Sequence, residues 1–214
     1  DLPQSLLGVV VGLSLYYYFV HIAIFDYERL LIDPFLALII LLCGAIFLRE
    51  LFRKSETPFQ NIAYTFLGII YVFMPFCLLV DISFFRHYYE PRIILGIFFL
   101  IWANDTFAYL VGSLIGKTKL LERISPGKTW EGFAGGGIAT LILAWFLSDL
   151  FTFQSVNLWH FHPWDWIIIG LLIVIFGTAG DLIESMLKRS SGVKDSGNIM
   201  AGHGGILDRF DSLI

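Results

Sequence analysis

Charged residues and cysteines are both scarce in this chain. Of its 214 residues only 15% are charged and two are cysteines, whereas 57% are hydrophobic. Soluble domains carry about 25% charged residues and disordered chains have low hydrophobicity, so the composition indicates a membrane protein. Cys43 and Cys77 both lie in apolar runs and frame neither a disulfide scaffold nor a zinc site. A sequence pI near 5.7 and the lack of a basic stripe argue against a nucleic-acid partner.

Long apolar segments recur along the chain at the length of a membrane-spanning helix. They predict an all-α, polytopic integral membrane helix bundle with at least six transmembrane helices in this fragment, of which both ends are expected to be truncated. The second and sixth segments are short for a hydrocarbon core about 30 Å thick. We expect residues 1–92 to form an N-terminal region of three spans and residues 93–214 a catalytic region with polar motifs. The six segments are Leu6–Phe25, Phe35–Leu48, Ile62–Val80, Ile93–Ile115, Phe133–Leu150 and Trp164–Thr178.

Lysine and arginine are distributed unevenly between the two sets of alternate loops. Loops 49–61, 116–132 and 179–214 hold 11 of the 14 basic residues, and the other three loops hold the remaining 3. The positive-inside rule therefore places the first three loops in the cytoplasm. We expect a multi-pass protein of the cell (inner) membrane whose polar motifs face the cytoplasm, with His160 and His162 on the far side.

The polar residues that could carry chemistry gather near the end of the chain. Asp181, Glu184, Ser185 and Lys188 are spaced so that one helical face carries two carboxylates, a hydroxyl and an ammonium group. The run 202–211 then adds glycine N–H groups beside a histidine, followed by two more carboxylates and an arginine. Acids that converge with Lys and Arg next to a membrane suit Mg²⁺ held against phosphate oxygens. A solvated charged tail is the alternative interpretation.

Two further polar features precede that region. Asp105 lies within an apolar span, where an ionised carboxylate costs about 2.5 kcal/mol or more, so it should face the bundle interior or a watery cavity. A hydrogen-bonded structural aspartate and the proton or ion relay of a transporter are alternatives. Residues 125–132, Ser-Pro-Gly-Lys-Thr-Trp-Glu-Gly, place hydroxyls and an ammonium group at a helix start, where they can meet a phosphate. The spacing of a P-loop is absent.

The order of these motifs resembles that of a known enzyme family. Ser185-Met-Leu-Lys-Arg189, then Lys194-Asp195, then His203-Gly-Gly-Ile-Leu-Asp-Arg-Phe-Asp211 is similar to the signature of the CDP-diacylglycerol synthases, also called phosphatidate cytidylyltransferases. The upstream segments Asp105-Thr-Phe-Ala-Tyr and Ser125-Pro-Gly-Lys-Thr-Trp-Glu-Gly resemble further segments of that family, in the same order. The likeness covers about residues 105–213, and the preceding region matches only as generic apolar spans.

The resemblance implies a Mg²⁺-dependent reaction in which phosphatidate attacks the α-phosphorus of CTP, giving CDP-diacylglycerol and pyrophosphate in the bilayer. It leaves open a second metal ion, a homodimer, and an isoprenoid ether lipid phosphate as acceptor. An ion- or proton-coupled transporter stays the alternative from another class, although its expected inverted repeats are not seen. The implied catalytic residues are Asp105, Asp181, Lys188 and Asp208. The implied metal ligands are Asp181, Glu184, Asp208 and Asp211. The implied substrate-binding residues are Ser125, Lys128, Thr129, Arg189, Lys194, Asp195, His203 and Arg209.

Overall fold

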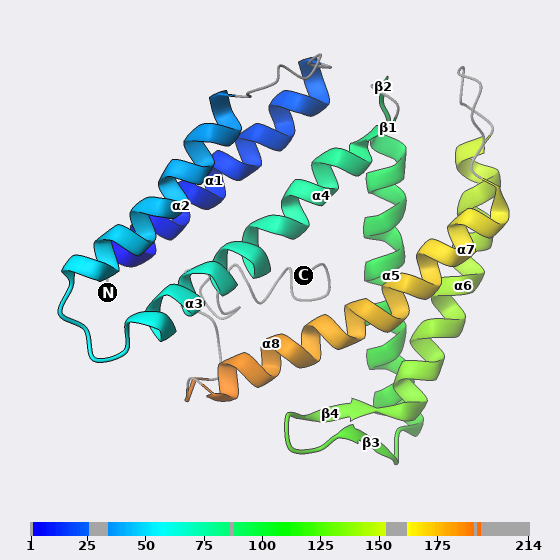
Figure 1. Ribbon diagram of the computed structural model, residues 1–214. Helices are drawn as coiled ribbons and strands as arrows, with labels where there is room; N and C mark the ends of the chain where they lie inside the picture. The colour runs from blue at the N-terminus through cyan, green and yellow to red at the C-terminus, as the bar shows by residue number, and fades with distance from the viewer. Residues whose placement is uncertain (1, 26–33, 86–87, 153–161, 191, 194–214) are drawn as a thin grey trace. The chain divides into compact units, whose positions relative to one another are not determined.

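The computed structural model describes residues 2–25, 34–85, 88–152, 162–190 and 192–193 (Figure 1). The chain divides into two compact units, Asp1–Pro91 and Arg92–Ile214, and each is treated by itself below. Among the described residues, six helices are long and apolar enough to cross a membrane. The prediction of a polytopic helical membrane protein is therefore confirmed.

The N-terminal unit consists of three long helices and a short hairpin. They are α1 (Leu2–Phe25), α2 (Pro34–Phe52) and a third helix built from α3 (Pro58–Gly68), the π-helical segment η1 (Ile69–Phe73) and α4 (Met74–Ser83). The two-residue strands β1 (Phe84–Phe85) and β2 (Tyr88–Tyr89) pair antiparallel. Val11, Ile46 and Ile69 form the buried centre of this unit, one residue from each long helix.

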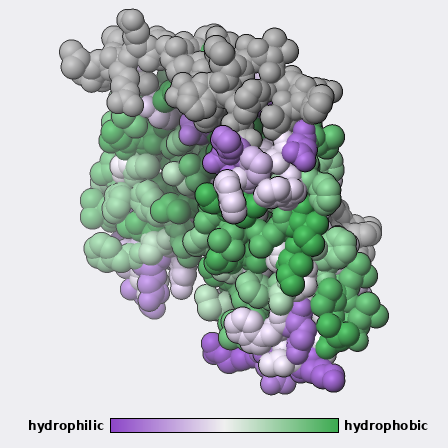
Figure 2. Space-filling view, turned by 90° about the vertical axis from the view of Figure 1, so that its right-hand side faces the viewer, coloured by the Kyte–Doolittle hydropathy of each residue, from purple (hydrophilic) through white to green (hydrophobic). Residues whose placement is uncertain are grey.

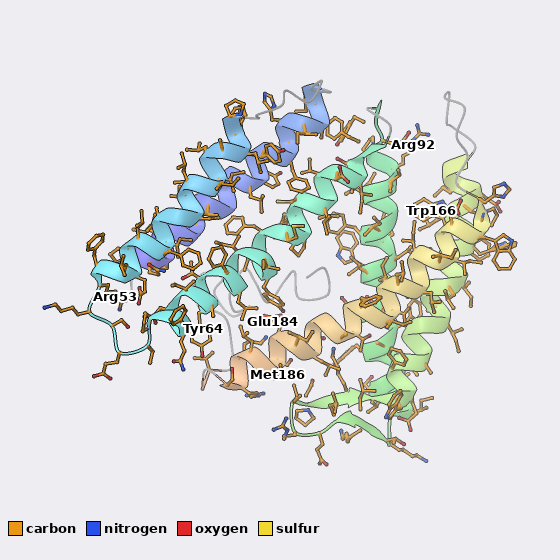
Figure 3. All side chains as sticks on the ribbon, viewed as in Figure 1. Arg53, Tyr64, Arg92, Trp166, Glu184 and Met186 are labelled. Carbon is orange, nitrogen blue, oxygen red and sulfur yellow. The ribbon has the colours of Figure 1, made fainter. Side chains whose placement is uncertain are left out.

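The second unit contains three further long helices. They are α5 (Pro91–Ile115), α6 (Trp130–Thr152) and a helix that runs through α7 (Pro163–Leu172), the π-helical segment η2 (Ile173–Gly177) and α8 (Thr178–Ser190). A hairpin of β3 (Lys119–Leu121) and β4 (Ser125–Thr129) lies between α5 and α6 in the chain. The core of the second unit is formed by Leu100, Ala144, Leu147 and Trp166, which come from α5, α6 and α7. Trp166 is labelled in Figure 3.

Local sequence explains where several of these helices begin. Proline is the first residue of α2, α3, α5 and α7, a position where its missing N–H removes no helical hydrogen bond. At the start of α7 the Asp165 carboxylate also accepts a hydrogen bond of 2.8 Å from the backbone N–H of His162. The prolines therefore mark helix starts that hydropathy alone leaves uncertain.

All six helices are longer than the apolar segments predicted, including the two segments that are short for a bilayer. The second runs over 19 residues, Pro34–Phe52, and the sixth over 28 residues, Pro163–Ser190, so neither is short for a bilayer. The predicted bounds were too narrow because both helices continue into polar residues that still satisfy their backbone hydrogen bonds within the helix. Gly192, with φ of 70°, follows α8, and the N–H of Val193 donates to the carbonyl of Lys188 at 3.0 Å, the pattern that closes a helix.

Large apolar side chains cover much of the exterior. Leu41 and Phe146, for example, are 71% and 63% exposed, and the coloured part of the face drawn in Figure 2 is mostly hydrophobic, with hydrophilic residues in separate patches. Such a surface would cause aggregation in water, but it is well solvated by the tails of membrane lipids. The chain is thus an integral membrane protein, as its hydropathy predicts.

Candidate active site

Glycines bring α5 and α6 into backbone contact. A Cβ added to Gly132 would lie 2.6 Å from the carbonyl oxygen of Ala108 and 3.1 Å from the Cα of Gly112. One turn further along α6, a Cβ on Gly136 would lie 2.8 Å from the carbonyl oxygen of Asn104. Glycines four residues apart are how membrane helices approach closely. The contact fixes the polar face of α5 beside the start of α6.

Side-chain hydrogen bonds attach the β3–β4 hairpin to the start of α6. The buried Thr129 hydroxyl accepts a hydrogen bond of 3.1 Å from the N–H of Gly132. The Glu131 carboxylate accepts hydrogen bonds from the N–H groups of Lys117 and Thr118 at 3.1–3.2 Å. The sequence predicts a helix start at residues 125–132, whereas residues 125–129 form a strand and the helix begins at Trp130. The hydrogen bonds of Thr129 and Glu131 fix the position of this strand relative to the start of α6.

A cavity of about 450 Å³ opens where these elements meet. That volume lies in the range of small-molecule sites, about 300–1,000 Å³. Six of its lining residues come from α5, five from the hairpin, two from α6 and two from α8. The described lining residues are Asn104, Asp105, Ala108, Tyr109, Gly112, Ser113, Leu120, Ser125, Gly127, Lys128, Thr129, Gly132, Phe133, Thr178 and Asp181.

Three charged residues from three different elements line this cavity. Asp105 comes from α5, Lys128 from β4 and Asp181 from the first turn of α8. The Lys128 ammonium group and the Asp181 carboxylate form an ion pair, and both side chains are about one quarter exposed. Asp105, within an apolar span, is exposed at the cavity, as predicted for a carboxylate in a membrane helix. Carboxylate oxygens are the ligands that Mg²⁺ prefers, and an ammonium group suits phosphate.

The rest of the predicted face on α8 is arranged differently. Glu184 is fully buried, and the ammonium nitrogen of Lys188 lies 3.3 Å from its Oε1 atom, one turn along the helix. Neither is among the described residues that line the cavity, and Arg189 is exposed at the end of α8. Figure 3 shows Glu184 on α8 near Met186. Helical spacing correctly places Asp181 and Glu184 on one helix, but only Asp181 lines the cavity.

Several predicted site residues lie outside the part of the chain that the structure describes. They are Lys194, Asp195, His203, Asp208, Arg209 and Asp211. Within the described ranges, no group of three or more histidine, cysteine or acidic residues is arranged to hold a metal ion. The two cavity carboxylates, Asp105 and Asp181, nevertheless have the donor chemistry that a magnesium ion requires. The metal assignment stays a prediction.

Sequence reasoning missed several polar and aromatic residues of this cavity. Asn104, Tyr109, Ser113 and Thr178 line it. Tyr109 and Ser113 follow Asp105 at intervals of four residues, so all three share one face of α5. That periodicity was readable in the sequence and could have identified both, because a charged residue within a span marks the polar face of its helix.

Comparison with known proteins shows extensive similarity to one family. Residues 3–214 match the model of the cytidylyltransferase family. The chain is 43% identical over 162 residues to a protein of Staphylococcus saprophyticus, and 42% identical over 161 residues to one of Bacillus subtilis, both named phosphatidate cytidylyltransferase. Each alignment covers 75% of this chain, and 58% and 57% of the respective relative. The chain thus spans a little more than half the length of these relatives.

Proposed function

The chain belongs to the cytidylyltransferase family, and from this we propose that it transfers the cytidylyl group of CTP to phosphatidate, giving CDP-diacylglycerol and pyrophosphate. The observation that carries the proposal is the cavity in which Asp105, Lys128 and Asp181 meet. The names of the similar proteins support the choice of lipid acceptor. We place the reaction at the cytoplasmic face of the cell's inner membrane, on the basis of the basic-residue count.

The proposed reaction needs positioning and charge neutralisation more than a protein nucleophile. An oxygen of the phosphatidate phosphate forms a bond to the α-phosphorus of CTP, and the bond from that phosphorus to the oxygen bridging to the β-phosphate breaks. The electron pair leaves with pyrophosphate. Both substrates are anions that repel each other, so the task of the site is to hold them in line and offset their charge.

The charged cavity residues have distinct roles in this proposal. Lys128 binds a substrate phosphate, and Asp105 and Asp181 would hold Mg²⁺, whose positive charge would offset the negative charge of the phosphate oxygens. Lys128 and Asp181 form an ion pair in the chain without substrate. Substrate phosphate would take the place of the Asp181 carboxylate at Lys128. The ion pair thus keeps both groups in the cavity before the substrates bind.

The depth of the cavity suits a lipid substrate. Asp105 lies ten residues before the end of α5 at Ile115, which corresponds to about 15 Å along the helix at 1.5 Å per residue. Ser125 and Lys128, in contrast, lie on the hairpin beyond that end. CTP would enter from water at the hairpin, whereas phosphatidate keeps its tails in the bilayer and presents its phosphate to the same cavity.

The test is a radiolabelled CTP assay with the purified chain, phosphatidate, and added or chelated Mg²⁺. Wild-type protein should form CDP-diacylglycerol only with Mg²⁺. Asp181→Asn should lose at least about 100-fold in turnover, because it removes a carboxylate that would hold Mg²⁺ against the negatively charged transition state. Lys119→Ala is the matched control for Lys128→Ala, because Lys119 lies on the same hairpin but is exposed and does not line the cavity.

Three results would contradict the proposal. Near-normal turnover of Asp181→Asn at saturating Mg²⁺ would exclude its role as a ligand. Equal losses in Lys128→Ala and Lys119→Ala would show that general charge on the hairpin matters rather than the cavity lysine. An isoprenoid ether lipid phosphate assayed in parallel distinguishes the acceptor, since product from that lipid alone would reject phosphatidate.

A further inference from the structure

A second cavity, of about 520 Å³, lies within the N-terminal unit. It is lined by α1, by α3 and η1 of the third helix, and by Arg53 just after α2. Among the described residues, it shares no lining residue with the candidate active site. The described lining residues are Gln4, Ser5, Gly8, Val9, Arg53, Asn61, Tyr64, Thr65, Gly68, Ile69, Val72 and Phe73.

This cavity is polar at one end and apolar at the other. The Gln4 side chain donates to the Thr65 hydroxyl at 3.3 Å, and a Cβ on Gly12 would lie 2.2–2.5 Å from ring carbons of Phe73. These contacts show that α1 and the third helix run in the same direction. The polar lining residues therefore lie together where both helices begin, whereas Val72 and Phe73 lie deeper.

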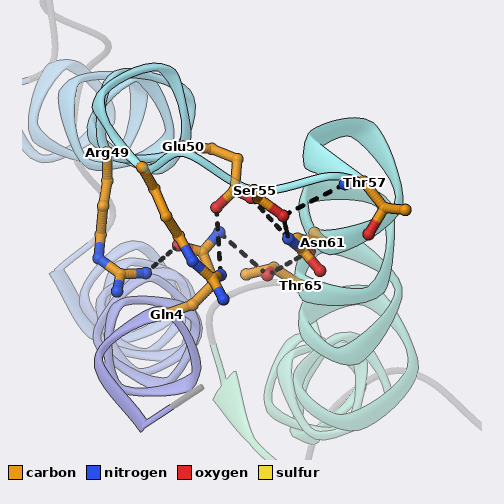
Figure 4. A network of polar contacts seen from close by, with 8 residues as sticks. Gln4, Arg49, Glu50, Ser55, Thr57, Asn61 and Thr65 are labelled. Atoms are coloured by element: carbon orange, nitrogen blue, oxygen red, sulfur yellow. Dashed lines mark hydrogen bonds and ion pairs between the residues drawn. The ribbon is translucent and has the colours of Figure 1, made fainter.

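Hydrogen bonds hold the polar end in place (Figure 4). The Glu50 carboxylate, on a residue only 2% exposed, accepts a hydrogen bond from the side-chain amide of Asn61 at 2.5 Å and lies 3.5 Å from the Arg53 guanidinium. The same Asn61 amide donates to the Ser55 hydroxyl at 2.9 Å. Arg53 is the only charged residue among the described lining residues, and the nearby Arg49 guanidinium donates to the side chain of a lining residue. Two guanidinium groups thus lie near one carboxylate, which gives this end a net positive charge.

At the apolar end of the cavity, a π-helical segment and a glycine leave space that side chains do not fill. The five residues Ile69–Phe73 are π-helical, a rare conformation that occurs often at functional sites. Gly68 precedes them in ordinary helical conformation, and a Cβ added there would meet no atom within 4 Å. From Asn61 to Phe73 the third helix rises about 18 Å at 1.5 Å per residue. That length is close to one leaflet, half of a hydrocarbon core about 30 Å thick.

We propose that this cavity binds an anionic phospholipid of the bilayer. The headgroup phosphate lies at Arg53, and one acyl chain extends along Val9, Val72 and Phe73. A guanidinium is a suitable donor for phosphate oxygens, and the leaflet-long apolar wall matches an acyl chain rather than a water-soluble anion. This site is independent of the proposed enzymatic activity.

Native mass spectrometry of the detergent-purified chain with added phosphatidylglycerol or phosphatidylcholine tests the proposal. We expect one retained phosphatidylglycerol per chain and at least 10-fold weaker retention of phosphatidylcholine. Gly68→Leu should abolish retention, because its side chain fills the apolar end, and Arg53→Gln should weaken retention at least 10-fold. Gly44→Leu is the matched control, since a Cβ there also meets nothing within 4 Å but Gly44 does not line the cavity.

The thermal midpoint measured without lipid verifies that each variant is folded. If Gly68→Leu does not fold, Val9→Phe fills the same cavity from α1 and replaces it in the comparison. Retention of phosphatidylglycerol by a folded cavity-filling variant at the wild-type level would overturn the proposal. So would equal retention of both lipids, or a midpoint increase with inorganic phosphate as large as the increase with phosphatidylglycerol.

Discussion

Replacing Gly132 by alanine probes the crossing of α5 and α6 with a single methyl group. The added Cβ would lie 2.6 Å from the carbonyl oxygen of Ala108, well inside van der Waals contact, and backbone atoms cannot rotate away as a side chain can. Gly44→Ala makes the same chemical change in α2, where a Cβ meets no atom within 4 Å. Both glycines lie in α-helices, so alanine suits the backbone at each position.

The two substitutions should therefore have effects of opposite sign. Alanine in place of glycine in a helix stabilises by about 0.8–1.0 kcal/mol. Only Gly44→Ala keeps this gain. At Gly132, overpacking costs about 1–3 kcal/mol, which leaves a net destabilisation of up to about 2 kcal/mol. The difference between the variants is the overpacking cost, and for a chain of this size each 1 kcal/mol shifts the thermal midpoint by about 2–4 °C.

Thermal unfolding of both variants in one detergent, followed by intrinsic fluorescence, measures this difference directly. We expect Gly44→Ala to unfold slightly above wild type and Gly132→Ala at least about 2 °C below Gly44→Ala. Turnover per folded molecule should also decline in Gly132→Ala, because Gly132 lines the candidate active-site cavity and its N–H donates to the Thr129 hydroxyl. Equal midpoints for the two variants would refute the close helix crossing.

Three further predictions follow from the charged residues. Single cysteines at Ser125 and His160, labelled in intact cells, should react from outside only at His160, because most basic residues lie in the loops on the Ser125 side; equal labelling would reject this topology. Lys188→Met should destabilise the fold by up to about 3–5 kcal/mol, because it leaves the buried Glu184 carboxylate without its lysine, and adding Glu184→Gln should restore much of the loss in chemical denaturation. Asp105→Ala should reduce turnover far more than the thermal midpoint, since this carboxylate is exposed at a cavity; a large fall in midpoint with unchanged turnover per folded molecule would exclude the cavity role.

Much of the fold was accessible from composition because the bilayer imposes a length on every span. The six apolar segments correspond to six helices among the described residues, but each helix is longer than its segment, the sixth by the most. Hydropathy measures how much of a helix is apolar, whereas a helix ends where its backbone hydrogen bonds find other partners. In the sixth helix that point is at Gly192, beyond Asp181 and Lys188. The helical spacing of those polar residues already indicated that the helix continues.

The candidate site was predictable in part, through motifs rather than through geometry. Asp105, Ser125, Lys128 and Asp181 were all selected from the sequence, and all four line one cavity. Their selection depended on charge within a span, on hydroxyl and ammonium groups beside glycines, and on resemblance to a family. Glu184 was selected by the same spacing argument, yet it is buried beside Lys188. Helical spacing shows which residues share a face of a helix, but it does not show what that face packs against.

The sequence by itself determined the class of the molecule, the six spans among its described residues and the residue types of its candidate site. These follow from properties that are local in the chain: apolar length, helical period and proline at helix starts. Only the tertiary structure decided that Lys128 and Asp181, 53 residues apart, form an ion pair, and that glycines of α5 and α6 touch. Such contacts depend on how closely helices approach, and packing sets that distance to fractions of an ångström through neighbours that no local pattern specifies.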